Sequence, residues 1–127
     1  DGMHGDPVRT QAYVRTLGDG EFVYRGPMGR GAKGHLGRTA VLVVGGTEVV
    51  VSERRVQLRD AEMLRTVGIE PLHCRLLVVK SAVHFQADIG TLAERIFDAD
   101  TPGVHRPELA TFKYQRIRRP IYPLDAM

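Results

Sequence analysis

The residues best suited to chemistry occur together in one short block, KSAVHF (residues 80–85). The block follows CRLLVVK (residues 74–80), a nearly continuous apolar run typical of strands buried in parallel sheets. In open α/β sheets, ligands bind just beyond the carboxyl ends of the strands. Lys80 would supply a cation, Ser81 a hydroxyl and His84 a group that exchanges protons near neutral pH. The pattern therefore predicts a ligand-facing loop, although Ser81 could be only a helix N-cap and His84 only a half-buried structural residue.

A β-α-β unit would position this loop. The apolar run supplies the first strand, Phe85–Phe97 a helix with one apolar stripe, and Phe97–Asp100 a second strand. The carboxyl ends of parallel strands meet at one edge of a sheet, so Asp100 and Thr101 would lie beside the loop, next to Lys80. Asp100 would then neutralise the lysine or cap a turn, and metal ligation is its less favoured role.

A second candidate is the glycine-rich segment GPMGRGAKGHLG (residues 26–37). Its glycine spacing matches G-x-G-x-x-G, but a strand follows where the dinucleotide-binding pattern requires a helix, so such a site is not predicted. The segment is interpreted as a wide hairpin connection or a flexible flap, whose backbone N–H groups and basic side chains could contact an anionic ligand. The candidate residues of this flexible loop are Gly29, Arg30, Gly31, Lys33, Gly34 and His35.

Glycine turns organise the first half of the chain into hairpins. The predicted strands are residues 11–17 and 21–25 around Gly18-Asp19-Gly20, and residues 38–44 and 48–52 around Gly45-Gly46-Thr47. Asp60 is expected to cap a short helix that Gly68 ends. The predicted fold is α+β: antiparallel hairpins joined to a β-α-β unit in one mixed sheet, as a single domain over residues 11–125 after a linker or tail at residues 1–10.

Composition excludes several classes of protein. The chain has 127 residues, which is long enough for one domain with a real core. Its 18 basic and 15 acidic side chains give only a mild positive charge. No run reaches the ~18 apolar residues of a membrane span, and no signal-peptide pattern begins the chain. The one cysteine, Cys74, cannot form an internal disulfide and fits a reducing cytoplasm. The start at Asp1 predicts a piece of a longer protein.

Metal and nucleic-acid sites are not predicted within this chain. The five histidines show neither H-E-x-x-H nor a Cys/His zinc spacing, and the His84–Asp88 pair alone is weak. The basic residues near the C-terminus are too sparse, with too few stacking aromatic residues, for a nucleic-acid surface.

Taken in order, many short motifs resemble one known family. The most specific are the K-S-x-x-H-F block at residues 80–85 and the R-R-P-I-Y-P-L-D ending at residues 118–125. The others are Gly26-Pro27-Met28, residues 36–42, 49–51, 55–57, 67–71, 78–79 and 100–103, and Tyr114. From about residue 7 to residue 125, the chain is similar to the C-terminal domain of the microcystinase C (MlrC)-type metallopeptidases.

The resemblance implies a role that the residues alone do not give. Full-length members are hydrolases that use zinc, and the founding activity cleaves a peptide bond of linearised microcystin. Their metal ligands lie in a larger N-terminal domain, so the resemblance implies zinc there and no catalytic or metal-binding residue in this chain. Lys80, Ser81, His84 and Phe85 would face a cleft between the two domains. The implied partners are that catalytic domain of the same polypeptide and a peptide-like or small amide substrate.

Two other functions compete with this interpretation. An interaction module would use the exposed edges of the hairpins to pair with another chain, for example in a homo-oligomer, and would take no part in catalysis. A nucleic-acid-binding domain is suggested only by the basic isoelectric point and ranks last.

Overall fold

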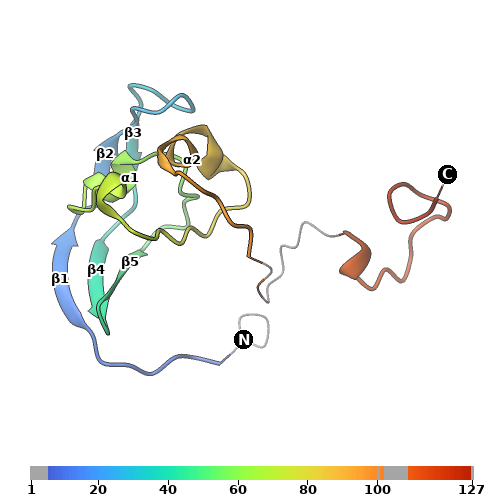
Figure 1. Cartoon of the computed structure of the whole chain (residues 1–127), viewed down its shortest axis with the longest axis horizontal. Helices are drawn as coiled ribbons and strands as arrows, with labels where there is room; N and C mark the ends of the chain where they lie inside the picture. The colour runs from blue at the N-terminus through green and yellow to red at the C-terminus, as the bar shows by residue number, and fades with distance from the viewer. Residues whose placement is uncertain (1–5, 100, 102–108, 127) are drawn as a thin grey trace. The chain divides into compact units, whose positions relative to one another are not determined.

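The computed structural model describes residues 6–99, 101 and 109–126, and the chain divides into two units (Figure 1). Residues 9–96 form the larger unit, and residues 1–8 and 97–127 form the other. The elements of the larger unit are β1 (Tyr13–Gly18), β2 (Glu21–Val23), β3 (Lys33–His35), β4 (Thr39–Val44), β5 (Thr47–Ser52), α1 (Glu62–Arg65), η1 (Pro71–His73), η2 (His84–Ala87) and α2 (Ile89–Leu92). The other unit holds the short 3-10 helix η3 (Leu109–Thr111).

The larger sheet has the strand order β1-β4-β5, and both of its strand pairs are antiparallel. The β4–β5 hairpin is confirmed. Gly45 and Gly46 adopt φ angles of 54° and 84°, which a two-residue turn between tightly twisted strands requires and which only glycine adopts without strain.

The hairpin predicted between residues 11–17 and 21–25 is wrong. Both strands exist, but β1 pairs with β4, and β2 pairs with β3 in a second sheet. The Gly18-Asp19-Gly20 turn directs the chain away from β1. Gly20 has a φ of 73°, and its carbonyl accepts a hydrogen bond from the Leu36 amide at 2.9 Å. Propensity marked the strands correctly, whereas their pairing depends on contacts distant in sequence.

The strand β3 lies inside the glycine-rich segment that was expected to be only a loop. Gly34 pairs with Phe22, and a Cβ at residue 34 would lie 2.3 Å from Cζ of the Phe22 ring. The missing side chain therefore leaves room for the aromatic ring to lie across the strand. Here glycine permits a strand where composition alone argues against one.

Helix α1 joins two small hydrophobic clusters. Met63 belongs to the first, with Phe22, Tyr24 and Leu36. Leu64 belongs to the second, whose other buried members are Val41, Val67 and Ile69. The predicted end of this helix is confirmed, since Gly68 adopts a φ of 79° and the Ile69 amide donates back to the Leu64 carbonyl.

The buried carboxylate of Asp60 ties this helix to β2. Asp60 is 1% exposed; its Oδ2 accepts from the amides of Gly26 (2.7 Å) and Arg25 (3.0 Å), and its Oδ1 accepts from the Glu62 amide at 2.9 Å. The contact to Glu62 lies at the start of α1, where Asp60 was expected to act as the cap, but Ala61 occupies the N-cap position and α1 has no side-chain cap there. The contacts to Arg25 and Gly26 add a cross-link that the sequence did not indicate.

The predicted mixed sheet with a β-α-β unit is wrong for the described residues. Both sheets are antiparallel, residues 74–80 form an extended segment without strand pairing, and residues 97–99 form no strand. The helix expected over Phe85–Phe97 is reduced to η2 and α2. Leu76 and Val78 are 78% and 86% exposed. The apolar run therefore has the residue pattern of a buried strand, but no strand pairs with it among the described residues. The α+β description holds only in the coarse sense of small sheets with few helices.

Across the described residues, the helices are all too short and too polar to traverse a lipid bilayer.

We predict that Asp60→Ala lowers the free energy of unfolding by about 3 kcal/mol, because three amides lose their acceptor at roughly 1 kcal/mol each. Urea unfolding followed by circular dichroism measures the loss. Asp19→Ala is the matched control, since within the described residues the exposed Asp19 carboxylate accepts one hydrogen bond, from the Glu21 amide, and its removal should cost about 1 kcal/mol or less. Equal losses in the two variants would contradict the cross-linking role of Asp60.

Candidate functional site

The block at residues 80–85 divides into one buried residue and several accessible ones. Phe85 is buried, Lys80 and His84 are exposed, and Ser81 is half-buried. The Ser81 hydroxyl is buried without a hydrogen-bond partner among the described residues, and η2 has no side-chain cap, so the alternative of an N-cap serine is not observed. Lys80 and His84 are thus the exposed polar side chains of this block.

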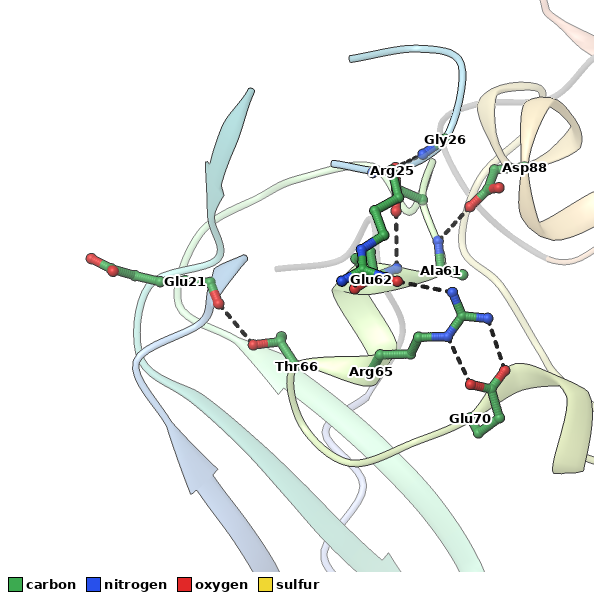
Figure 2. Close-up of polar contacts among 10 residues, drawn as sticks. Glu21, Arg25, Gly26, Ala61, Glu62, Arg65, Thr66, Glu70 and Asp88 are labelled. Carbon is green, nitrogen blue, oxygen red and sulfur yellow. Dashed lines mark hydrogen bonds and ion pairs between the residues drawn. The ribbon is translucent and has the colours of Figure 1, made fainter. Parts of the chain in front are cut away.

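Asp88 holds this part of the chain in place. Its Oδ2 accepts from the Ala61 amide at 2.6 Å, which links the α2 segment to the start of α1 (Figure 2). Gly26 allows the two carboxylates of Asp60 and Asp88 to approach the backbone closely, because a Cβ there would lie 2.9 Å from Cγ of Asp88 and 3.0 Å from Oδ2 of Asp60. His84 therefore starts a short helix whose position is fixed by Asp88 and by the burial of Phe85 and Ile89.

His84 lines an open hollow of about 270 Å³ together with Arg55, Val56, Gln57 and Arg59. The Arg59 guanidinium carbon lies 4.6 Å from the centre of the Tyr24 ring, and its Nη2 donates to the Tyr24 hydroxyl at 3.0 Å. Two guanidinium groups, one amide and one imidazole therefore surround one space.

The sequence analysis gave no role to Arg55, Gln57 and Arg59. A weak signal was present, because the pattern R-x-Q-x-R gathers three polar side chains within five residues. The segment carries no chemical motif of its own, and only the fold brings it to His84.

The glycine-rich loop lies at a different place. Lys33, Gly34 and His35 line a second hollow, of about 380 Å³, with the strand β2. The Gly31 amide donates to the Tyr24 carbonyl at 2.8 Å, and Nδ1 of His35 accepts from the Gly37 amide at 3.2 Å. These groups have partners within the hairpin, and an anion contact at Gly29, Arg30 or Lys33 stays a prediction.

The remaining sequence candidates are not assembled into a site. Asp100 lies outside the described residues, and Thr101 is exposed in the smaller unit. Cys74 is half-buried, and its Sγ donates to the Glu70 carbonyl at 3.5 Å. The expected place of Asp100 and Thr101 beside Lys80 remains a prediction.

The described residues do not offer a metal centre. No group of three or more His, Cys, Asp or Glu side chains is placed to hold a metal ion there. Asp60 and Asp88 approach each other at Gly26, but their carboxylates already accept backbone N–H groups. The chemistry that this arrangement supports is recognition by positive charge and hydrogen-bond donors.

Ion pairs fix two further segments. On α1, Arg65 pairs with Glu62 at 2.9 Å and with Glu70 at 2.7 Å (Figure 2), and the hydrogen bonds from Arg65 lower the pKa of Glu70. Near the C-terminus, Arg119 forms a bidentate pair with Asp125, which also accepts from the Ile121 amide at 2.7 Å. The pKa of Asp125 is lowered, first by Arg119 and then by that amide. The R-R-P-I-Y-P-L-D ending is thus a closed loop held by its own side chains.

Comparisons with known proteins point in one direction. The sequence model of a family described as MlrC C-terminus matches residues 1–116. Microcystinase C from Sphingomonas sp. is 25% identical to the chain over 96 residues. These aligned residues cover 76% of this chain and 18% of that protein. The chain is also similar to the crystal structure of a "putative metallopeptidase" from Mesorhizobium sp. BNC1, with a TM-score of 0.72, 28% identity, and coverage of 91% of this chain and 23% of that one. The chain therefore spans about a fifth of the length of these two relatives.

The ion pair at the C-terminal loop leads to a pH prediction. Because the pKa of Asp125 is lower when the loop is closed, the pair stabilises the closed loop above about pH 4 and is lost as the pH falls through the lowered pKa. A carbon-13 NMR titration of the Asp125 carboxyl should give a pKa below 3.8, and Arg119→Gln should return it toward that value. Arg118→Gln is the matched control and should leave it unchanged. An ordinary pKa in the unmodified chain would refute the pairing.

Proposed function

The chain belongs to the MlrC C-terminus family, and from this membership we propose that it is the C-terminal domain of a zinc-dependent peptidase or amide hydrolase. In this proposal a preceding domain of the same polypeptide holds the zinc and performs the hydrolysis. The present domain forms one side of the substrate cleft and is inactive alone. The names of the two relatives, a microcystinase and a metallopeptidase, support the reaction class.

The observation that carries the cleft role is the position of His84. It belongs to the K-S-x-x-H-F block, and it borders the open hollow with Arg55 and Arg59. Accessible polar and charged side chains gathered around a hollow are typical of a binding site. Lys80 is exposed four residues before His84 and adds a further positive charge near the start of η2.

The surface of the larger sheet supports a large neighbouring domain. Val41 and Val50 face the α1 cluster, so the residues that alternate with them face the other way. The strand pairing aligns six apolar side chains on this outer face: Val14, Leu17, Ala40, Leu42, Val49 and Val51. Leu17 is 76% exposed, and the others are exposed or half-buried. A continuous apolar face of this kind is normally covered by another part of a protein.

The extended segment at residues 74–80 supports the same conclusion. Leu76 and Val78 are largely exposed, and the backbone of the segment is not paired in either sheet. A strand contributed by the preceding domain could pair with it, which would bury these side chains. Since the relatives are about four times as long as this chain, the preceding domain is the occupant that we propose for both surfaces.

We expect that His84→Ala and Lys80→Ala, each introduced into the full-length polypeptide, lower kcat/KM for peptide hydrolysis by about tenfold or more, which corresponds to losing roughly 1.4 kcal/mol of transition-state stabilisation. The melting temperature should not change, because both side chains are exposed. His73→Ala is the matched control, an exposed histidine of the same unit that does not line the hollow. Unchanged kinetics in both variants would reject the cleft role.

The apolar outer face also favours a second candidate function, an interaction module that joins copies of the protein and has no direct role in catalysis. Val51→Lys separates the two functions. In the isolated chain we expect the free energy of unfolding to change by less than about 0.5 kcal/mol, because Val51 is 47% exposed.

In the full-length protein, a domain contact predicts a lower melting temperature at an unchanged molecular mass. A contact between copies predicts instead a shift from oligomer to monomer in sedimentation equilibrium. Val23→Lys is the control, an equally exposed valine on the other sheet. A full-length protein that keeps both its melting temperature and its mass would contradict both uses of this face.

A further inference from the structure

We infer that the hollow bordered by Arg55, Gln57, Arg59 and His84 binds a carboxylate group of the substrate. This inference deepens the proposed function and rests on it for the origin of the ligand. The carboxylate would be the C-terminus of a peptide or an acidic side chain, and both present the same planar pair of oxygens.

The first step is the charge that the hollow leaves uncompensated. Four arginines of the larger unit form ion pairs with carboxylates: Arg15, Arg25, Arg38 and Arg65. Within the described part of the chain, Arg55 and Arg59 make no ion pair. The neighbouring carboxylate of Asp60 is directed to three backbone amides instead. The hollow therefore holds two guanidinium charges, and His84 adds a third when it is protonated.

The second step is the preorganisation of Arg59. Its guanidinium stacks on the Tyr24 ring and donates to the Tyr24 hydroxyl, which restricts its rotation. Its Nε is buried without a hydrogen-bond partner among the described residues. A guanidinium that is already fixed and partly dehydrated loses less entropy and less hydration when an anion binds. Arginine also presents its donors as a planar fork that matches the two oxygens of a carboxylate.

The third step is the arrangement of the remaining donors. Arg55, Gln57 and Arg59 all border the same hollow, with Val56 between the first two, while His84 reaches it from the start of η2. The Gln57 amide can donate to an oxygen that the guanidinium groups leave free. A hollow of about 270 Å³ admits a small planar group. Positive charge together with an uncharged donor selects an anionic group over a neutral amide.

The test titrates the nitrogen-15-labelled chain with three probes and follows backbone amide shifts. N-acetylglycine represents a peptide C-terminus, N-acetylglutamate α-methylamide represents an acidic side chain, and N-acetylglycinamide is the neutral counterpart. We expect saturable shifts at residues 55, 57, 59 and 84 with at least one of the two acids, weakened by added salt, and no saturation with the amide. The acid that binds more tightly identifies the source of the carboxylate.

The matched variants are Arg55→Gln and Arg54→Gln, because both arginines are exposed and only Arg55 borders the hollow. Arg55→Gln should weaken binding about tenfold, and Arg54→Gln should leave it unchanged. Arg59→Gln is a second variant, accepted only where its amide spectrum remains that of the folded chain. Equal binding of the neutral amide, equal losses in Arg54→Gln and Arg55→Gln, or tighter binding of inorganic phosphate than of either acid would overturn the inference.

The outcome is separable from that of the proposed function. If the acids bind the hollow but His84→Ala leaves peptide hydrolysis by the full-length protein unchanged, the cleft role fails and the carboxylate site stands. If hydrolysis falls in His84→Ala but no acid binds, the carboxylate inference alone fails.

Discussion

The carboxylate of Asp60 is the contact on which the rest of the larger unit depends. It is almost completely buried, and it accepts hydrogen bonds from the amides of Arg25 and Gly26, shortly after β2, and from the amide of Glu62, which begins α1. A buried carboxylate is tolerated only where hydrogen bonds replace its lost hydration, so the three amides and the carboxylate require one another. Asp88 extends the same arrangement by accepting the amide of Ala61, the next residue along the chain. Two carboxylates thus fix the relative positions of β2, α1 and the segment that carries His84.

This arrangement also shows how the proposed binding surface could be positioned by segments with little regular structure. Arg59 immediately precedes Asp60, so its backbone is positioned by the buried carboxylate, and its side chain is held by Tyr24 at the end of β2. His84 lies four residues before Asp88 and next to the buried Phe85. Arg59 and His84 therefore each adjoin a buried residue that fixes the backbone beside them. A site on irregular segments can be precise when its neighbours are constrained in this way.

Local signals in the sequence identified some elements correctly and missed their partners. The Gly45-Gly46 turn and the end of α1 at Gly68 depend on neighbouring residues, and both are confirmed. Asp60 does hold the start of α1, through the Glu62 amide, but Ala61 occupies the N-cap position. The pairing of β1 with β4 and the strand at Gly34 depend on contacts with residues distant in the sequence, which no local pattern reports. The candidate site shows the same division. His84 stood out because its block contains reactive residue types, whereas Arg55 and Arg59 appeared as ordinary basic residues until the fold brought them to His84.

The wrong prediction at residues 74–80 follows from a physical property of the segment itself. Its apolar pattern is that of a strand buried on both faces, and such a strand forms only where a neighbouring backbone satisfies its N–H and C=O groups. The described chain offers no such neighbour, and the outer face of β1, β4 and β5 is likewise apolar and open. Covering both surfaces would be favourable, since burial of apolar surface contributes about 25 cal/mol of free energy for every Å² removed from water. The K-S-x-x-H-F block begins at the end of this segment, so pairing the segment with a strand of a preceding domain would bring Lys80 and His84 to the boundary between the two domains. The surfaces that would join the domains and the residues that would bind the substrate are therefore consecutive in the chain, which is the arrangement that a cleft between domains requires.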